Sequence, residues 1–239
     1  MKIRSLSLFV LSAAAACGGG NQVSLSVRAG SSTATALARP TSNALTLSNG
    51  IELTRVRIVL DDIKLEKVTG SASGDVEEDD LRLDPILLDL QGATLDGGVQ
   101  RVIDAPIAAG TYQELKLKIH KPESSEAGVS ADAALADMAA QGASIVVDGN
   151  IDGAAFTFTT AVEAEQKFEG AVTLGGGSNL TLSVDPTTWF GASSSARLDP
   201  RVEGNRSQIE ENIKTSFKAY RDDDRDGRDD AEQADGGHN

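Results

Sequence analysis

Cysteine and aromatic residues are scarce in this chain. Of its 239 residues, Cys17 is the single cysteine, and aromatic side chains make up 4%. One cysteine excludes a disulfide within the chain, so stability must come from an apolar core, a bound metal ion or both. The core must consist mainly of Val, Ile and Leu. The two histidines, His120 and His238, are too few for a metal site built from several histidines.

Basic residues are also in short supply. The chain has 22 Lys and Arg against 36 Asp and Glu, a formal net charge of −14. Without residues 1–16, which include Lys2 and Arg4, it keeps 20 basic residues and has a charge of −16. Nucleic acids and anionic membranes are bound through clusters of Lys and Arg. We therefore exclude nucleic-acid binding.

The first residues have the layout of a secretory signal. Lys2 and Arg4 give a positive start, residues 5–16 are apolar or small, and three alanines precede Cys17. We interpret this as a bacterial lipoprotein signal, in which the chain is cut before Cys17 and the cysteine is acylated. An unpaired cysteine otherwise has no evident purpose in an exported protein. The alternative is an ordinary cleaved signal, because alanine stands where lipoprotein signals favour Leu, three residues before the cysteine.

The apolar part of this signal does not predict a membrane span. It has 12 residues, whereas about 20 are needed to cross ~30 Å of hydrocarbon. Residues 18–21, Gly-Gly-Gly-Asn, predict a flexible tether after the lipid. Gly18 rather than Asp follows the cysteine, and resemblance to known lipoproteins then implies the outer membrane, facing the periplasm or the exterior.

Alternation of apolar and polar residues dominates the rest of the chain, as is typical of half-buried strands. Leu115, Leu117 and Ile119, for example, alternate with charged residues. Many short strands separated by turn residues, without long alternating helices, predict an all-β fold, an antiparallel β-sandwich of Ig-like or jelly-roll-like type. We expect strands over residues 23–28, 51–68, 86–90, 99–103, 112–120, 143–147, 155–160, 164–168 and 179–184.

Three segments are less regular. Residues 51–68 allow one long bent strand or two strands that meet at Asp61–Asp62, where a solvated turn is favoured over a bulge. Residues 69–84 contain a run of four acidic residues and predict a solvated loop. Residues 122–142 lack alternation, and Ser130 could cap a short helix within them.

A helix is predicted near the C-terminus. Ser207 to Glu210 matches a capping box, in which the Ser hydroxyl and the Glu carboxylate accept from each other's backbone N–H groups. The apolar stripe that follows has helical spacings of four, four and three residues, at Ile209, Ile213, Phe217 and Tyr220. We expect this amphipathic helix to pack on the sandwich.

An acidic segment directly after Tyr220 has the spacing of an EF-hand calcium loop. Alternate carboxylates in a tight turn point at one centre, and Gly227 at position 6 permits the turn. At the closing position 12, however, Gln233 replaces the bidentate Glu, and Glu232 lies one residue early. The alternative interpretation is a solvated acidic C-terminus. The predicted calcium ligands, at positions 1, 3, 5, 7 and 9, are the carboxylates of Asp222, Asp224, Asp226 and Asp230 and the carbonyl of Arg228.

Two further residues, Trp189 and His120, are candidates for a functional role. Trp189 could stack a sugar ring if it is exposed, but a Trp near a strand end more often closes an apolar core, which we favour. His120 lies on the polar face of its strand and is predicted to be a lone surface histidine. The chain has no G-x-S-x-G motif, and Gly175–Gly177 precede a strand rather than a helix. We therefore expect that the protein is not an enzyme.

A family resemblance covers most of residues 50–230. The segments Leu53–Leu65, Ile86–Leu90 and Ala109–Leu117 resemble those of a family of bacterial lipoproteins of unknown function. The part from Val184 through the acidic segment resembles the version found in myxobacterial surface lipoproteins. The resemblance implies a β-sandwich domain with a carbohydrate-binding role, and it implies no catalytic residues.

Together these patterns predict a lipid-anchored envelope protein that acts as a non-catalytic binding module, with carbohydrate as ligand and calcium at the C-terminal loop. The alternative is a structural or assembly lipoprotein that holds an envelope protein through the sandwich edge. The expected organisation is a signal peptide (1–16), a lipidated cysteine with its tether (17–22), a β-sandwich (23–204), a capped helix with a calcium-type loop (205–233) and a polar tail (234–239).

Overall fold

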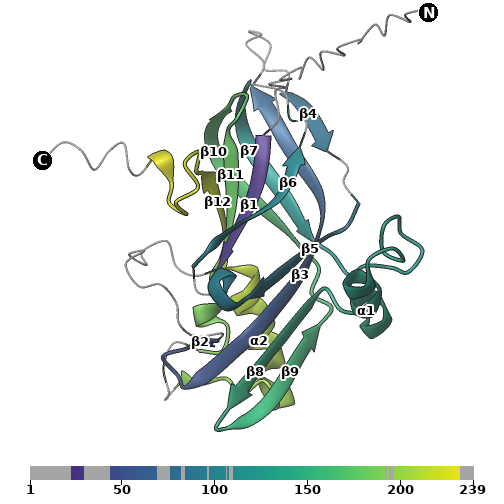
Figure 1. Cartoon of the computed structure of the whole chain (residues 1–239), viewed down its shortest axis with the longest axis vertical. Coiled ribbons are helices and arrows are strands. Elements are labelled where there is room, and N and C mark those ends of the chain that lie inside the picture. The colour runs from purple at the N-terminus through teal and green to yellow at the C-terminus, as the bar shows by residue number, and fades with distance from the viewer. Residues whose placement is uncertain are drawn as a thin grey trace, which may run out of the picture.

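The computed structural model describes residues 23–29, 44–68, 76–81, 84–95, 97–105, 107, 110–191, 193 and 196–231. The predicted lipidation site Cys17, with the signal and the tether, lies outside these residues, as do Glu232 and Gln233. The described chain forms twelve β-strands and two α-helices in an elongated molecule (Figure 1). This confirms the prediction of an all-β fold.

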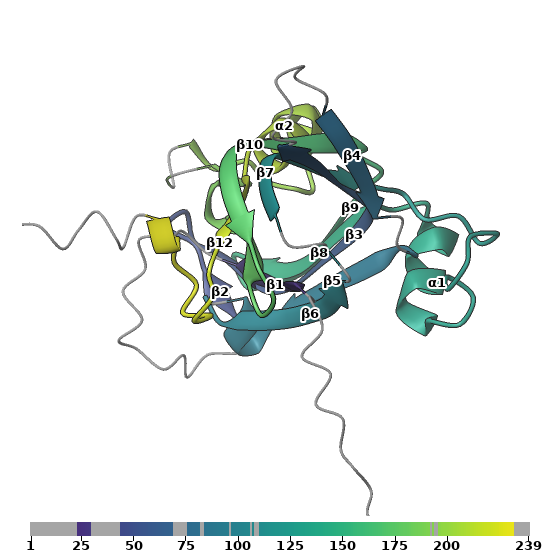
Figure 2. The same cartoon turned by 90° about the horizontal axis from the view of Figure 1, so that it is seen from above.

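The strands form two sheets that lie opposite one another (Figure 2). The smaller sheet has the order β12-β11-β1-β6, with these strands at Phe217–Arg221, Asn179–Val184, Val23–Ala29 and Val99–Ala105. Neighbouring strands run antiparallel, except that β1 and β11 are parallel. The larger sheet contains β2 (Leu45–Thr46), β3 (Ile51–Val68), β4 (Val76–Leu81), β5 (Ile86–Gln91), β7 (Gly110–Ile119), β8 (Ile145–Ile151), β9 (Ala154–Thr160) and β10 (Ala164–Leu174).

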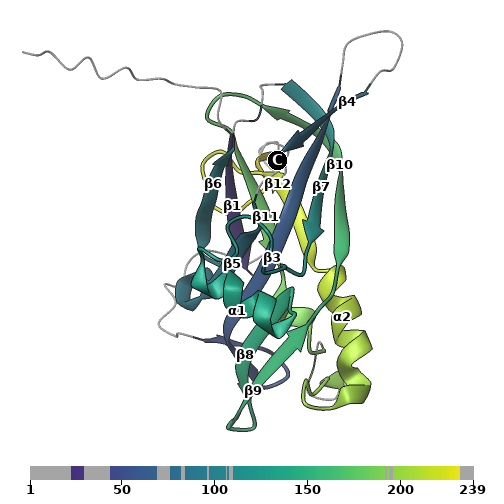
Figure 3. The ribbon, with the colours of Figure 1, turned by 90° about the vertical axis from the view of Figure 1, so that its right-hand side faces the viewer.

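Strand β3 runs along the long axis of the molecule and organises the larger sheet (Figure 3). Its first half pairs with β8 and β5, and its second half pairs with β7 and β4. The pairing with β7 shifts register between Asp61 and Ile63, which marks a β-bulge. The interpretation of residues 51–68 as one long bent strand is therefore confirmed, and the solvated turn at Asp61–Asp62 is wrong.

The two sheets share one apolar core, which the period-2 pattern of their strands explains. In the smaller sheet, strands β1 and β11 turn apolar residues inward, as with Leu25 on β1 and Leu182 on β11. They meet the inner face of the larger sheet, where Leu53, Val56 and Ile58 are fully buried. As the composition predicts, aliphatic side chains make up most of this core.

The prediction that residues 69–84 form a solvated loop is wrong, because part of this segment forms strand β4. This strand pairs with β3 from Val76 opposite Val68 to Leu81 opposite Ile63. The backbone register sets Lys64 opposite Asp80 and Lys67 opposite Glu77, whereas Glu66 lies opposite Glu78. The acidic segment is therefore a strand because its backbone pairs with the second half of β3.

Helix α1 (Ala133–Gln141) covers the outer face of the larger sheet, where Leu135 and Met138 pack with Val59 and Val146. Its cap is Asp132, whose side chain accepts hydrogen bonds from two backbone N–H groups, so the prediction of Ser130 as cap is wrong. Within the described residues, neither this helix nor the second one is long and apolar enough to cross a membrane.

Helix α2 (Arg206–Lys214) is shorter than predicted. It begins before Ser207, so the predicted capping box does not form; Glu210 instead accepts a hydrogen bond from Thr160 Oγ1 (2.7 Å). The helix buries Ile209 and Ile213 in the main core. The remaining positions of the predicted stripe, Phe217 and Tyr220, belong to strand β12, which pairs with β11. Residues 206–221 therefore belong to the sandwich, because they supply two core side chains and an edge strand.

Candidate metal centre

The acidic loop, residues Asp222–Ala231, leaves β12 and lies on one flank of the molecule (Figure 1). It brings three predicted ligands together: carboxylate oxygens of Asp222, Asp224 and Asp226 lie within 4.8 Å of one another. Three converging carboxylates are the oxygen donors that calcium prefers, and side chains two residues apart in a tight turn can reach one ion. Positions 1, 3 and 5 of the predicted loop therefore have the expected arrangement.

Asp222 differs from its two neighbours because it is fully buried, whereas Asp224 and Asp226 are exposed. Its Oδ2 atom accepts hydrogen bonds from Thr181 Oγ1 (2.8 Å) and from the Gly227 N–H (3.1 Å). Its Oδ1 atom is buried and has no hydrogen-bond donor among the described residues. A buried carboxylate oxygen without a donor is costly, by about 1–3 kcal/mol or more for a charged group.

The surroundings of Asp222 disfavour its charged form in the absence of a cation. Burial raises the pKa of this carboxyl, and the negative charges of Asp226 and Asp224 raise it further. The hydrogen bonds from Thr181 and Gly227 act in the opposite direction but do not cancel the rise in pKa. A divalent cation beside Oδ1 would supply the missing partner and reverse this preference.

Backbone hydrogen bonds shape the loop around these carboxylates. Asp224 Oδ1 accepts from the Asp226 N–H (3.1 Å), and Asp226 Oδ1 accepts from the Arg228 N–H (2.8 Å). Gly227 has φ 81°, a left-handed conformation that favours glycine. A Cβ atom there would lie 2.8 Å from Arg28 Cδ. The predicted turn position therefore requires glycine both for its backbone and for its contact with β1.

Asp230, the predicted ligand at position 9, is not in this cluster. Its Oδ2 atom accepts from the Asp223 N–H (2.9 Å) and lies 3.8 Å from Arg221 Nε. Arg221 also pairs with Asp223. Burial alone would raise the pKa of Asp223, but hydrogen bonds from Arg221 and from the Asn179 N–H lower it below its usual range. Asp230 is therefore not a member of the carboxylate cluster, and it joins the second half of the loop to the backbone of Asp223 and to Arg221 of β12.

The loop covers a polar face that the sequence pattern alone would leave in solvent. The outward positions of β1 and β11 alternate with their core residues, yet all of them are buried. Such a buried polar face needs hydrogen-bond partners. The face consists of Ser24, Ser26, Arg28, Asn179, Thr181 and Ser183.

Asn179 is the centre of the contact between this face and the loop. Its Oδ1 accepts from the hydroxyls of Ser24 and Ser26 (2.8 Å each), and its Nδ2 donates to Thr181 Oγ1 (3.0 Å) and to the Asp222 carbonyl (2.9 Å). Its backbone carbonyl accepts from the Asp222 N–H (3.0 Å). One buried amide therefore fixes the residue that begins the loop.

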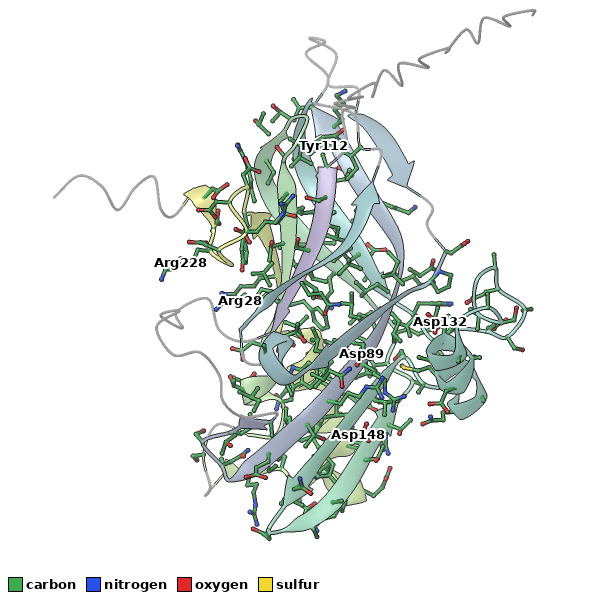
Figure 4. The ribbon with its side chains drawn as sticks, in the orientation of Figure 1. Arg28, Asp89, Tyr112, Asp132, Asp148 and Arg228 are labelled. Atoms are coloured by element: carbon green, nitrogen blue, oxygen red, sulfur yellow. The ribbon has the colours of Figure 1, made fainter. Side chains whose placement is uncertain are left out.

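Arg28 holds the loop at its turn. Its guanidinium donates to the Gly227 carbonyl, which also accepts from the Tyr220 hydroxyl (2.8 Å). Figure 4 shows Arg28 on the same flank as Arg228 of the loop. Arg225 is turned to β1, where it donates to Ser24 Oγ (3.1 Å). These contacts attach the loop to the smaller sheet at both Asp222 and Gly227.

The structure does not support Trp189 as a sugar-binding residue. Trp189 is fully buried, and its indole N–H donates to Ser216 Oγ (2.7 Å). It therefore closes the core, as favoured above, and cannot stack a sugar ring. In the described part of the chain, the exposed large apolar side chains are Val68 and Val202.

His120 is not the surface histidine that the sequence predicts. Its side chain is 11% exposed, with Nε2 2.7 Å from Glu126 Oε1 and Nδ1 3.8 Å from Glu163 Oε1. These carboxylates come from the connections that follow β7 and β9. The histidine therefore joins two connections of the larger sheet.

Comparisons with known proteins identify no family. No protein-family model and no curated protein matches the chain. Among solved structures, the chain is similar to MbnP from Methylosinus trichosporium, with 14% identity over 72% of this chain and 77% of that chain and a TM-score of 0.34. A likeness this weak supports no argument about function, so the proposals below rest on the geometry of the acidic loop and on the sequence.

Proposed function

We propose that this chain is a non-catalytic, calcium-binding module of the bacterial cell envelope, carried on the outer membrane by a lipid at Cys17. The observation that carries the calcium site is Asp222 Oδ1, a buried carboxylate oxygen without a donor that belongs to a group of three carboxylates. A fully buried carboxylate of this kind requires a cation partner in the charged form.

The donor set favours calcium over other metals. Carboxylate and carbonyl oxygens suit Ca²⁺ and Mg²⁺, whereas Zn²⁺ and Cu²⁺ prefer histidine nitrogen or cysteine sulfur. Calcium takes 6–8 oxygens in a flexible geometry, which suits a loop with two exposed carboxylates. Asp222, Asp224 and Asp226 would hold the ion, and the Arg228 carbonyl is proposed as a further ligand. Calcium at millimolar concentration outside cells is sufficient for weak extracellular sites.

Removal of two exposed ligands is expected to abolish calcium binding. Isothermal titration of the protein with CaCl₂ should give one site, with a Kd on the order of 10⁻⁴–10⁻³ M. The variant Asp224→Ala with Asp226→Ala should show no binding, because Asp222 alone cannot coordinate the ion. Both residues are exposed, so the variant should remain folded.

A matched control removes two acidic side chains elsewhere. Glu203 and Glu211 have side chains that are 84% and 63% exposed and lie outside the acidic loop. Glu203→Ala with Glu211→Ala makes the same change in net charge and should bind calcium like the unaltered protein. Equal calcium binding by all three proteins would contradict the assignment of the site.

The anchor at Cys17 is tested separately. We expect mass spectrometry of membrane fractions to find a mature chain that begins at Cys17 and carries acyl groups. Cys17→Ser should remove the acyl groups and release the protein from the membrane fraction, because a lipid of this kind is what holds it there. A mature chain with an unmodified Cys17 in the membrane fraction would refute the lipid anchor while leaving the calcium site unaffected.

The physiological partner is a separate part of the proposal. The sequence suggests a glycan or an envelope protein as partner, and the glycan prediction comes from the family resemblance. Trp189, the candidate residue for stacking a sugar ring, is buried and gives that prediction no support. The part of the structure best suited to hold a ligand is instead a cleft beside the acidic loop.

A further inference from the structure

A cleft of about 690 Å³ lies between the two sheets, next to the acidic loop. It is bounded by β10 and β7 of the larger sheet and by β11 and β12 of the smaller one. Strands β10 and β12 are edge strands of different sheets and approach one another at this side of the sandwich. Strand β10 also shifts register against β7 between Glu169 and Val172, and such a bulge bends an edge strand. This volume is typical of sites for small molecules.

The chemistry of the cleft changes from its interior to its mouth. Its mouth includes Arg221 of β12 and three residues of the acidic loop, Asp229, Asp230 and Ala231. The charge of Arg221 is already compensated by Asp223 and Asp230. The mouth is therefore negative, in a chain with a net charge of −14. The rest of the lining is mainly apolar and aromatic, with Leu65, Tyr112, Leu115, Phe168, Leu174 and Leu180. Glu114, which pairs with Lys116, and Thr173 are its polar members.

We propose that this cleft binds a small, largely apolar molecule that is uncharged and has a hydrogen-bond donor at one end, and that calcium in the acidic loop strengthens this binding. An apolar body gains by leaving water for the space between the sheets. A donor at the mouth would meet the carboxylates of Asp229 and Asp230. An anionic molecule of the same size is disfavoured by those carboxylates.

The dependence on calcium rests on the proposed function and follows from the two halves of the acidic loop. The first half, Asp222–Asp226, holds the three carboxylates, and the second half, Asp229–Ala231, forms part of the cleft. The hydrogen bond from the Asp223 N–H to Asp230 Oδ2 joins the two halves. An ion that restrains the first half therefore also restrains the wall of the cleft. When calcium has already ordered the loop, the molecule in the cleft no longer has to pay the conformational entropy of ordering it, and it binds more tightly.

Two fluorescent probes that differ by one sulfonate test the ligand class. N-phenyl-1-naphthylamine is apolar, is uncharged and has one N–H donor, whereas 8-anilino-1-naphthalenesulfonate has the same rings and a negative charge. We expect the uncharged probe to bind the purified protein and to bind more tightly than the anionic probe. Tighter binding of the anionic probe would overturn the assigned ligand class.

The location of the probe is tested by filling the cleft. Val172 lines the cleft, and Val172→Trp should abolish binding of the uncharged probe while calcium titration remains normal, which also shows that the variant is folded. Val202 is 51% exposed and does not line the cleft, so Val202→Trp is the matched control and should bind the probe normally. If both variants lost probe binding equally, or if neither variant lost it, the proposed location of the probe would be overturned.

The coupling is measured in both directions. The affinity for the uncharged probe should rise about fivefold or more when EDTA is replaced by saturating calcium, and calcium affinity should rise by the same factor with saturating probe. Asp224→Ala with Asp226→Ala should keep the affinity measured in EDTA. If calcium binds but the probe does not, the cleft proposal fails and the calcium site stands. If calcium and the uncharged probe both bind but neither changes the affinity for the other, the coupling is refuted. If calcium does not bind, the proposed calcium-binding function is refuted, and the coupling with it.

Discussion

Asp222→Asn is expected to stabilise the protein in EDTA and to abolish its stabilisation by calcium. In thermal melts at pH 7, the midpoint in EDTA should rise by about 2–4 °C, the shift that ~1 kcal/mol gives in a domain of this size. In calcium at about 100 times the Kd, the midpoint should fall below that of the unaltered protein. At that concentration the ligand contributes ~2.7 kcal/mol to the unaltered protein, and the variant loses this contribution.

The expected rise of the melting midpoint of Asp222→Asn in EDTA follows from the raised pKa of Asp222. The folded state binds this proton more readily than the unfolded state does, so the carboxyl stabilises the fold below its unfolded pKa. This contribution is lost as the pH rises through the folded pKa. At pH 7, above the unfolded pKa, burial of this acid therefore costs free energy that burial of a neutral side chain of the same shape does not. In Asp222→Asn the amide carbonyl can accept the hydrogen bonds from Thr181 and Gly227, and an NH₂ group replaces the oxygen that lacks a donor.

Asp224→Asn is the matched control for this experiment. It makes the same change in charge at an exposed position of the same cluster. It should weaken calcium binding without raising the midpoint in EDTA, because no buried charge is removed. If the two variants gave the same midpoints in EDTA, the burial of Asp222 would not be the cause of the effect.

Asn179→Ala is expected to produce the largest loss of stability, on the order of 3–5 kcal/mol, in EDTA and in calcium alike. The alanine variant leaves the hydroxyls of Ser24 and Ser26 and the carbonyl of Asp222 without their buried partner. Each buried polar group left in this state costs about 1–3 kcal/mol. Urea denaturation at pH 7 measures the loss as a lower midpoint.

Asn205→Ala serves as the comparison for Asn179. The Asn205 side chain is half-buried and donates one hydrogen bond, to the Asp199 carbonyl (3.1 Å). Its replacement should cost about 1 kcal/mol, the net contribution of an ordinary hydrogen bond. If Asn179→Ala cost no more than Asn205→Ala, the buried polar face would not be what holds the acidic loop.

Much of the sandwich could be predicted because its strands carry a clear period of two. Leu115, Leu117 and Ile119, for example, alternate in the sequence and are buried in the structure. The C-terminal helix could be predicted only in part. Phe217 and Tyr220 fit a helical spacing, but a strand that joins β11 buries them equally well, with Phe217 toward the core and Tyr220 against the acidic loop. Local spacing cannot decide between these alternatives, because the pairing partner is more than thirty residues away.

The candidate site shows the same division. The first three ligands could be predicted, since their spacing in a tight turn depends only on local residues. The polar face beneath the loop could not, because Ser26 and Thr181 alternate with core residues as solvent-facing residues do. Their burial depends on a loop that follows β12 and returns over β1 and β11. Asp230 was also predicted as a ligand, but its hydrogen bond to the Asp223 N–H depends on how the loop turns at the end of β12.

The most direct test of the calcium site is a crystal structure of the protein grown in millimolar CaCl₂, with a second crystal grown in TbCl₃ to identify the ion by its anomalous signal. We predict one ion bound by Asp222 Oδ1, Asp224 and Asp226 at distances of about 2.3–2.6 Å. An ordered acidic loop with no ion at these carboxylates, or with Asp222 Oδ1 paired to a protein group, would contradict the account.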